Sequence, residues 1–185
     1  MKNYIAPILI LLVLVSSCKK EDKINPFAVS KHQVGFLNDS TQVKEIKVLF
    51  ANDSIVNPKE DDSFAGGINT IDIYEKGGNQ LLSISPTEAL DSTATISSIR
   101  LLDPRYITDK SISSISTFKD INDNYKISKI SNLINSVVVK VNELDATFTI
   151  DKKELPVNMR FDMDMKIDPI QIPEDAKVKF FIVHF

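Results

Sequence analysis

The chain has 185 residues, of which 43% are hydrophobic and 25% are charged, a balance typical of a globular protein of about one domain. Its single cysteine excludes a disulfide scaffold and a cysteine-based zinc site. The formal net charge of −3 supplies no general basic field for binding phosphates. We therefore expect no nucleic-acid partner.

The first 17 residues have the order of a bacterial signal peptide. An apolar run over residues 5–15 is much shorter than the roughly 20 residues that span a bilayer. It ends at Val15-Ser16-Ser17-Cys18, which resembles the lipobox, in which the cysteine is diacylated and becomes the new N-terminus. We predict a lipid anchor at Cys18, because several acyl chains hold a protein durably on a membrane. A signal peptide without lipidation, with an incidental cysteine, is the alternative.

Four charged residues, Lys19, Lys20, Glu21 and Asp22, follow that cysteine. A lysine-acid cluster at this place resembles the export signal of Bacteroidota lipoproteins, and it predicts an outer-membrane protein that faces the cell surface. A solvated spacer on a protein that faces the periplasm explains the same composition. Residues 18–33 then form the lipidated cysteine and a flexible tether, and residues 34–185 form one globular domain.

The first predicted element of that domain is an amphipathic helix over about residues 41–51. Gly77-Gly78 lies between two alternating segments and predicts a β-hairpin with a two-residue turn, in which Ile73 lies opposite Leu82. A further strand is predicted over residues 95–102.

A second helix is predicted from Thr117, where Asp120 completes a capping box. Both helix starts share the order apolar, Lys, acid, Ile, with an aromatic residue four positions after the isoleucine. The chain therefore contains either an internal repeat or two convergent helix starts.

A second hairpin follows this helix. If Asn142 pairs with Asp145, Val139 lies opposite Phe148 and both face the core. The last segment, residues 177–185, is mostly apolar on both faces and predicts an interior strand. We predict an α+β fold, with a mainly antiparallel sheet of about six strands and two short amphipathic helices.

With these elements placed, the sequence resembles a small family of bacterial lipoproteins of unknown function that includes a sigma-E-regulated envelope lipoprotein. The matching stretches lie within residues 29–41, 96–120 and 177–179. The resemblance implies an envelope location and a compact α+β domain. It carries over no catalytic residue.

One candidate contact loop contains Asp103, Arg105 and Tyr106, directly after a predicted strand. Arginine and tyrosine are enriched at the hot spots of protein interfaces. An ordinary turn begun by Asp103-Pro104 is the alternative.

Three serines, Ser40, Ser54 and Ser92, each follow an aspartate in a motif that resembles the O-glycosylation sites of Bacteroidota envelope proteins. The alternative is that Ser40 starts a helix and that the other two are loop residues.

The sequence offers few groups for catalysis. Of the two histidines, His32 lies in the predicted tether and His184 is next to last in an apolar strand. Asp162, Asp164 and Asp168 alternate with apolar residues, which is typical of the exposed face of an extended segment. We expect no metal and no cofactor.

These observations predict a non-enzymatic interaction or structural module, anchored to the outer membrane, with an envelope protein or glycan as its partner. The alternative is a ligand-binding lipoprotein with a pocket between sheet and helices. An enzyme that uses carboxylates alone is a third hypothesis.

Overall fold

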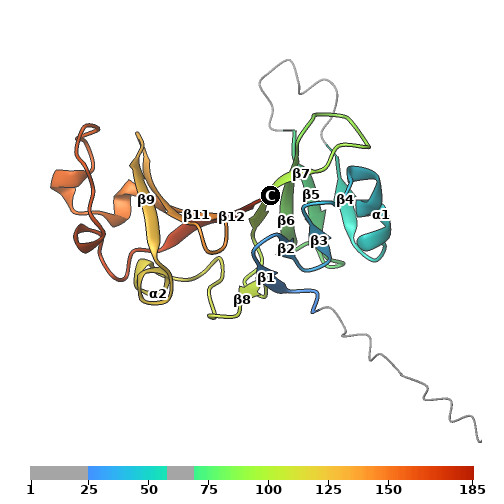
Figure 1. Cartoon of the computed structure of the whole chain (residues 1–185), viewed down its shortest axis with the longest axis horizontal. Helices are drawn as coiled ribbons and strands as arrows, with labels where there is room; N and C mark the ends of the chain where they lie inside the picture. Colours follow the sequence, from blue (N-terminus) through green and yellow to red (C-terminus); the bar gives the residue numbers. More distant parts are fainter. Residues whose placement is uncertain (1–24, 58–68) are drawn as a thin grey trace, which may run out of the picture.

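The computed structural model describes residues 25–57 and 69–185 (Figure 1). The predicted signal peptide, Cys18 and the cluster Lys19–Asp22 lie outside the described residues. The described part contains a large antiparallel sheet of eight strands, in the order β4-β5-β6-β7-β12-β11-β10-β9. A small mixed sheet has the order β3-β2-β1-β8, and its only parallel pair is β1 with β8.

The large sheet contains β4 (Ser54–Val56), β5 (Ile71–Tyr74), β6 (Gln80–Pro86), β7 (Ile96–Leu101), β9 (Ile127–Asn132), β10 (Ser136–Val141), β11 (Ala146–Asp151) and β12 (Val178–His184). The small sheet contains β1 (Ala28–Ser30), β2 (Gln33–Val34), β3 (Leu37–Asn38) and β8 (Ile107–Thr108). The helices are α1 (Ile46–Leu49), which continues a 3₁₀ turn at Val43–Glu45, and α2 (Phe118–Asn124). None of the described helices is long and apolar enough to cross a membrane.

The predicted mainly antiparallel sheet with two short helices is confirmed, but the predicted number of about six strands is wrong. The four strands of the small sheet have two or three residues each, too few for an alternating pattern to be visible. The folded domain also begins before residue 34. Val29 of β1 lies in the segment predicted as a tether, yet it is buried in the core.

The predicted core registers of both hairpins are confirmed: Ile73 lies opposite Leu82, and Val139 lies opposite Phe148. The turn of the first hairpin differs from the prediction, because the register shifts by one residue after Ile73. The backbone N–H of Glu75 donates to the carbonyl of Asn79, 2.9 Å away, so the turn is longer than two residues. Strand β12 pairs with β7 on one side and β11 on the other, as expected for an interior strand.

The two halves of the chain repeat one arrangement, a helix followed by four antiparallel strands of the large sheet. In each half the residue before the helical segment bridges to the residue before the fourth strand, as Gln42–Thr95 and Thr117–Lys177. The next two backbone N–H groups of each half also donate to matching carbonyls. In the first half, Val43 donates to Ala94 at 3.0 Å and Lys44 to Ser92 at 2.9 Å. In the second half, Phe118 donates to Ala176 at 2.8 Å and Lys119 to Glu174 at 2.9 Å. Similar helix starts alone do not require these long-range bonds, so the geometry supports a structural repeat.

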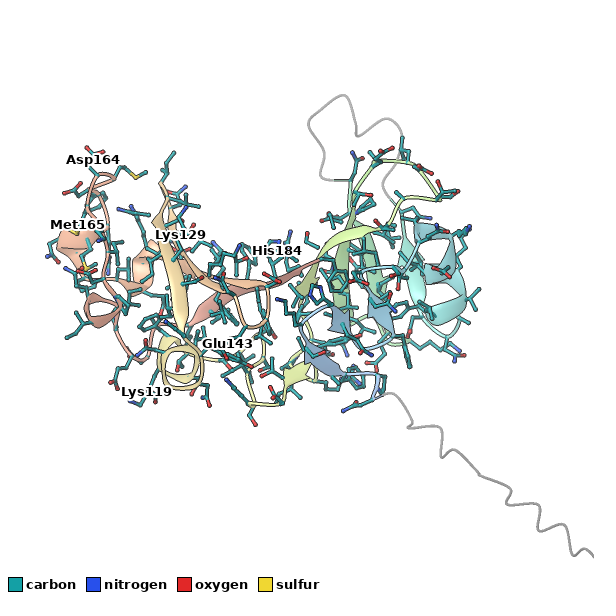
Figure 2. The ribbon with its side chains drawn as sticks, viewed as in Figure 1. Lys119, Lys129, Glu143, Asp164, Met165 and His184 are labelled. Carbon is teal, nitrogen blue, oxygen red and sulfur yellow. The ribbon has the colours of Figure 1, made fainter. Side chains whose placement is uncertain are left out.

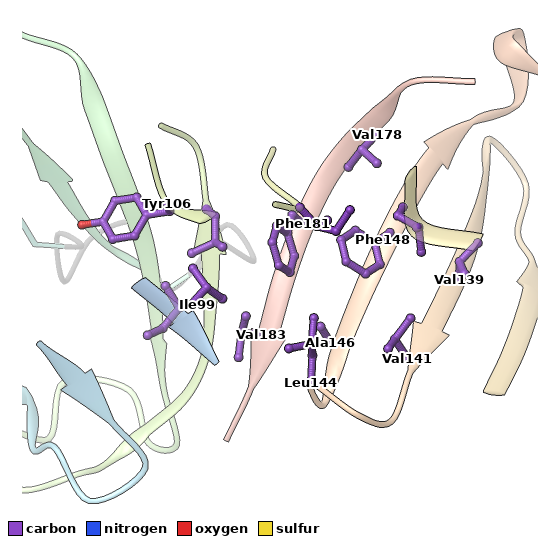
Figure 3. Packing of buried hydrophobic residues seen from close by; sticks show 14 of the residues in the cluster. Ile99, Tyr106, Val139, Val141, Leu144, Ala146, Phe148, Val178, Phe181 and Val183 are labelled. Atoms are coloured by element: carbon purple, nitrogen blue, oxygen red, sulfur yellow. The ribbon is translucent and has the colours of Figure 1, made fainter. Parts of the chain in front are cut away.

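The core lies between one face of the large sheet and the layer formed by α1, α2 and the small sheet. Its buried residues form one cluster that includes Val34 of the small sheet, Ile46 of α1 and Ile121 of α2. Figure 3 shows side chains from β7, β12 and β11 meeting at its centre, where Phe148 and Phe181 lie side by side. We call this side of the large sheet the inner face and the opposite side the outer face.

Candidate functional site

In the predicted contact loop, Arg105 makes its contacts within the protein. The guanidinium of Arg105 donates to carboxylate oxygens of Asp103 at 2.8 Å and of Glu75 at 2.9 Å. It also lies over the ring of Phe27, with 4.5 Å between Cζ and the ring centroid. These hydrogen bonds hold the pKa values of the Asp103 and Glu75 carboxyls below their usual range. Arg105 therefore connects the segment before β1 to the β5–β6 hairpin.

Tyr106 belongs to the core, contrary to our expectation of a contact residue. Its side chain is 2% exposed, and its ring meets Phe27 edge-on with 5.1 Å between centroids. Burial raises the pKa of its phenol. Tyr106 directly precedes β8, and its ring belongs to the core cluster together with residues of both sheets. Only Asp103 and Arg105 therefore remain candidates for a surface contact in this loop.

The three serines of the glycosylation motifs all lie on the surface. Ser40, Ser54 and Ser92 are exposed, and Ser54 begins the edge strand β4. The hydroxyl of Ser40 donates to its neighbour Asp39 at 3.1 Å. Exposure is what a glycan needs, and modification of these residues stays a prediction.

The acidic residues after β11 do not share an extended face, so that expectation is wrong. Asp162 accepts the N–H groups of Asp164 and Met165 at 3.0 and 3.1 Å and forms a tight turn. Asp168 instead precedes a 3₁₀ turn at Pro169–Gln171. Among the described residues there is no group of three His, Cys, Asp or Glu that could hold a metal ion.

The outer face of the large sheet is a surface that the sequence did not reveal. One row of directly paired residues crosses it from β7 to β9, namely Arg100, Ile182, Thr147, Lys140 and Lys129. A second row contains Phe180, Thr149, Val138 and Ser131. In Figure 2, Lys129 and His184 point to this side, whereas Glu143 and Lys119 lie on the side of α2.

At the centre of the outer face an aromatic ring lies between cations. Cζ of Arg100 is 4.9 Å and Nζ of Lys179 is 5.6 Å from the centroid of the Phe180 ring. Lys179 is paired with Asp151 at 2.9 Å, and no described carboxylate pairs with Arg100. Phe180 and the neighbouring Ile182 are half-buried. From β7 to β9, the outer face thus combines apolar area with positive charge.

His184 extends the outer face toward the β10–β11 turn. Its Nε2 is hydrogen-bonded to the hydroxyl of Thr147 at 2.9 Å. Burial, followed by repulsion from Lys140, lowers the pKa of the imidazole. The ring is therefore neutral at pH 7 and contributes a polar, uncharged group to the surface.

A cavity of about 370 Å³ lies between α1 and the large sheet, where the alternative function predicts a pocket. The apolar part of its wall is formed by Ile46, Ile55 and Ile71. Polar groups come from Lys44, Asp91 and Ser92. This cavity suits a small, largely apolar ligand.

Comparison with known proteins bears on the fold. No protein-family model matches the sequence, and no curated protein matches it. Among solved structures, the chain is similar to the uncharacterized protein YfeY from Escherichia coli, with a TM-score of 0.50 and 18% sequence identity. The match covers 85% of this chain and 99% of that chain. The chain therefore shares a mainly-β fold with a protein that is itself uncharacterized.

Proposed function

We propose that this protein is a lipid-anchored component of the bacterial outer membrane that faces the cell surface and binds an envelope protein without catalysing a reaction. The lipobox-like segment before Cys18 and the cluster Lys19–Asp22 support the anchor and its sidedness. The outer face of the large sheet supports the interaction.

The observation that carries this proposal is the central patch of the outer face. Phe180 and Ile182 offer half-buried apolar area, and Arg100 beside them is a residue type that dominates interface energies. Aliphatic side chains in the patch favour a protein over a glycan, because a partner can bury them against its own apolar side chains.

Charge indicates the kind of partner surface. The whole chain has an excess of acidic residues, 25 against 22 basic ones. Along the outer face, however, Arg100, Lys129 and Lys140 form no ion pair with any described carboxylate. A partner with acidic groups around an apolar centre is complementary to this arrangement, and such complementarity raises both specificity and association rate.

Site-specific photo-crosslinking in intact cells tests the proposal. A photo-reactive residue at Thr149, on the outer face, should capture a protein partner. The same residue at Val48, which is 78% exposed on α1, is the matched control and should not. Phe180→Ala should reduce the Thr149 adduct while leaving the amount of folded protein unchanged.

Three results would contradict the proposed interaction. Equal adducts from Thr149 and Val48 would indicate random collision, and the absence of any adduct at Thr149 would leave the outer face without a partner. An adduct whose added mass is removed by glycosidases would replace the protein partner with a glycan.

The cavity beside α1 supports a second candidate function, the binding of a small apolar ligand. A ligand for this cavity should raise the melting temperature of the wild type, because binding to the folded state stabilises it. Ser92→Trp places a large ring at the cavity wall and should abolish that rise. An unchanged rise in the variant would exclude this cavity as the site.

A further inference from the structure

A second cavity, of about 660 Å³, lies where β11 and β12 meet the segment that connects them. It is separate from the cavity beside α1, and it borders the end of the outer face. Its lining residues are mainly basic or apolar: Lys152, Lys153, Arg160, Lys179, Asp151, Ile134, Asn135, Phe161 and Met163.

Lys152 is the unusual member of this lining. It begins the 3₁₀ turn after β11, and it is only 4% exposed. Among the described residues, the one hydrogen-bond partner of its ammonium is the thioether sulfur of Met163, at 3.5 Å. An ammonium has three donors, a thioether is a weak acceptor, and a buried charge without a counter-charge is costly. An anion in the cavity would supply that counter-charge.

The charge around Lys152 strengthens this preference. Four basic side chains line the cavity against the single carboxylate of Asp151. That carboxylate is already engaged, because it accepts the backbone N–H of Lys153 at 3.0 Å and the ammonium of Lys179 at 2.9 Å. Arg160 donates to the carbonyls of Leu155 and Lys153 at 2.8 and 2.9 Å, so it braces the wall while it keeps its charge beside the cavity.

The mouth of the cavity is apolar. Phe161 is 83% exposed, Ile134 is 74% exposed and Met163 is 43% exposed, although all three are large hydrophobic residues. They come from two separate segments, the β9–β10 turn and the connection from β11 to β12. Exposed apolar residues that gather around a polar pocket mark a surface that binds something apolar.

We propose that this cavity binds an anionic amphiphile, whose phosphate group lies beside Lys152 and whose hydrocarbon chain lies along Ile134, Phe161 and Met163. A lysine suits this role because its ammonium acts as a point charge toward phosphate. The amphiphile is either a phospholipid that stays in its bilayer or a free monomer, since both present the same headgroup and chain. This site shares Lys179 with the outer face, but the proposal does not rest on the protein partner proposed there.

Calorimetric titration tests the site, with the chain from residue 18 onward produced without acyl chains. The probe is dihexanoyl phosphatidylglycerol below its micelle concentration. Lys152→Met, which keeps an unbranched side chain of similar volume but removes the ammonium, should weaken binding about tenfold or more. The matched control is Lys166→Met, the same substitution at an exposed lysine of the same connection that does not line the cavity. It should leave the affinity unchanged.

Two further measurements separate a binding role from a structural one. The melting temperature of ligand-free Lys152→Met should equal or exceed that of the wild type, because the substitution removes a buried charge. Phe161→Ser alters a side chain that is almost fully exposed, so it should preserve folding. It should nevertheless weaken the binding of the amphiphile, because the chain loses apolar contact.

Several outcomes would overturn the proposal. Equal affinity in Lys152→Met and wild type would remove the headgroup site, and equally tight binding of dihexanoyl phosphatidylcholine would remove the preference for an anion. Inorganic phosphate that binds as tightly as the lipid would show that the apolar mouth adds nothing. Flotation with phosphatidylglycerol vesicles then distinguishes the two sources: co-flotation that Lys152→Met abolishes supports a bilayer lipid, and monomer binding without flotation supports a free amphiphile.

Discussion

Replacing Phe148 by alanine should destabilise the domain by about 3 to 5 kcal/mol, the usual cost of removing a fully buried aromatic ring. Phe148 is 0% exposed at the centre of the core. Its ring is stacked on that of Phe181, with 4.5 Å between centroids and 29° between planes. Truncation therefore removes apolar area, leaves a cavity between β11 and β12, and deprives Phe181 of its neighbour. The loss is a large share of the roughly 5 to 15 kcal/mol that stabilises a typical domain.

Urea unfolding followed by circular dichroism measures this effect. A slope of about 2 kcal/mol per molar urea converts the expected loss into a fall of about 1.5 to 2.5 M in the unfolding midpoint. The matched control is Thr149→Ala, because Thr149 is the next residue of β11 but lies half-buried on the outer face. Its midpoint should change little. Equal midpoints for the two variants would refute the assignment of inner and outer faces.

Cys18→Ala should move the protein out of the membrane fraction, because the proposed acyl chains would attach to that sulfur and to the N-terminus it creates; unchanged membrane residence without a lipid label would rule out lipidation. Replacing all four residues of Lys19–Asp22 by alanine should keep the protein lipidated and folded but protect it from protease added to intact cells, and protection of the wild type as well would defeat surface display. The free energy of unfolding should fall as the pH is lowered from about 7.5 to about 5.5, because the unfolded state binds a proton at the ordinary His pKa while the folded state holds the pKa of His184 lower. His184→Asn should lessen this dependence, and an identical slope in variant and wild type would exclude His184 as its source.

The elements that could be predicted from sequence are those with local signals. The register of the β10–β11 hairpin follows from strict alternation on both sides of a short turn, and one slipped residue would expose Val139 and Phe148 together. The start of α2 follows from its capping box, in which the N–H of Thr117 donates to Asp120 at 2.8 Å. In both cases these determining contacts lie within nine residues of one another along the chain.

The small sheet could not be predicted, because its strands are defined by distant contacts. The pairing of Val29 with Thr108 joins segments that are 79 residues apart in the chain. Neither strand is long enough to show a period. The same contacts explain why Tyr106 was wrongly predicted to be a contact residue. Its segment has the composition of a surface turn, but its side chain is buried.

The candidate surfaces depend on long-range pairing in the same way. Arg100 and Phe180 come together only because β7 pairs with β12, and no local pattern specifies that neighbour. Lys152 lies in a run of charged residues that is typical of a solvated turn, and only the fold shows that its side chain is buried.

The structural repeat suggests why the second half of the chain carries the more distinctive chemistry. The connection to the fourth strand covers residues 87–95 in the first half and residues 152–177 in the second. The longer connection supplies Lys152, Arg160, Phe161 and Met163, and hence most of the proposed amphiphile site. The shared helix-and-strand arrangement builds the core and pairs β7 with β12, whereas the longer connection of the second half has no counterpart of that length in the first. A long connection on a rigid scaffold is where proteins commonly place binding residues, because it can vary without disturbing the core.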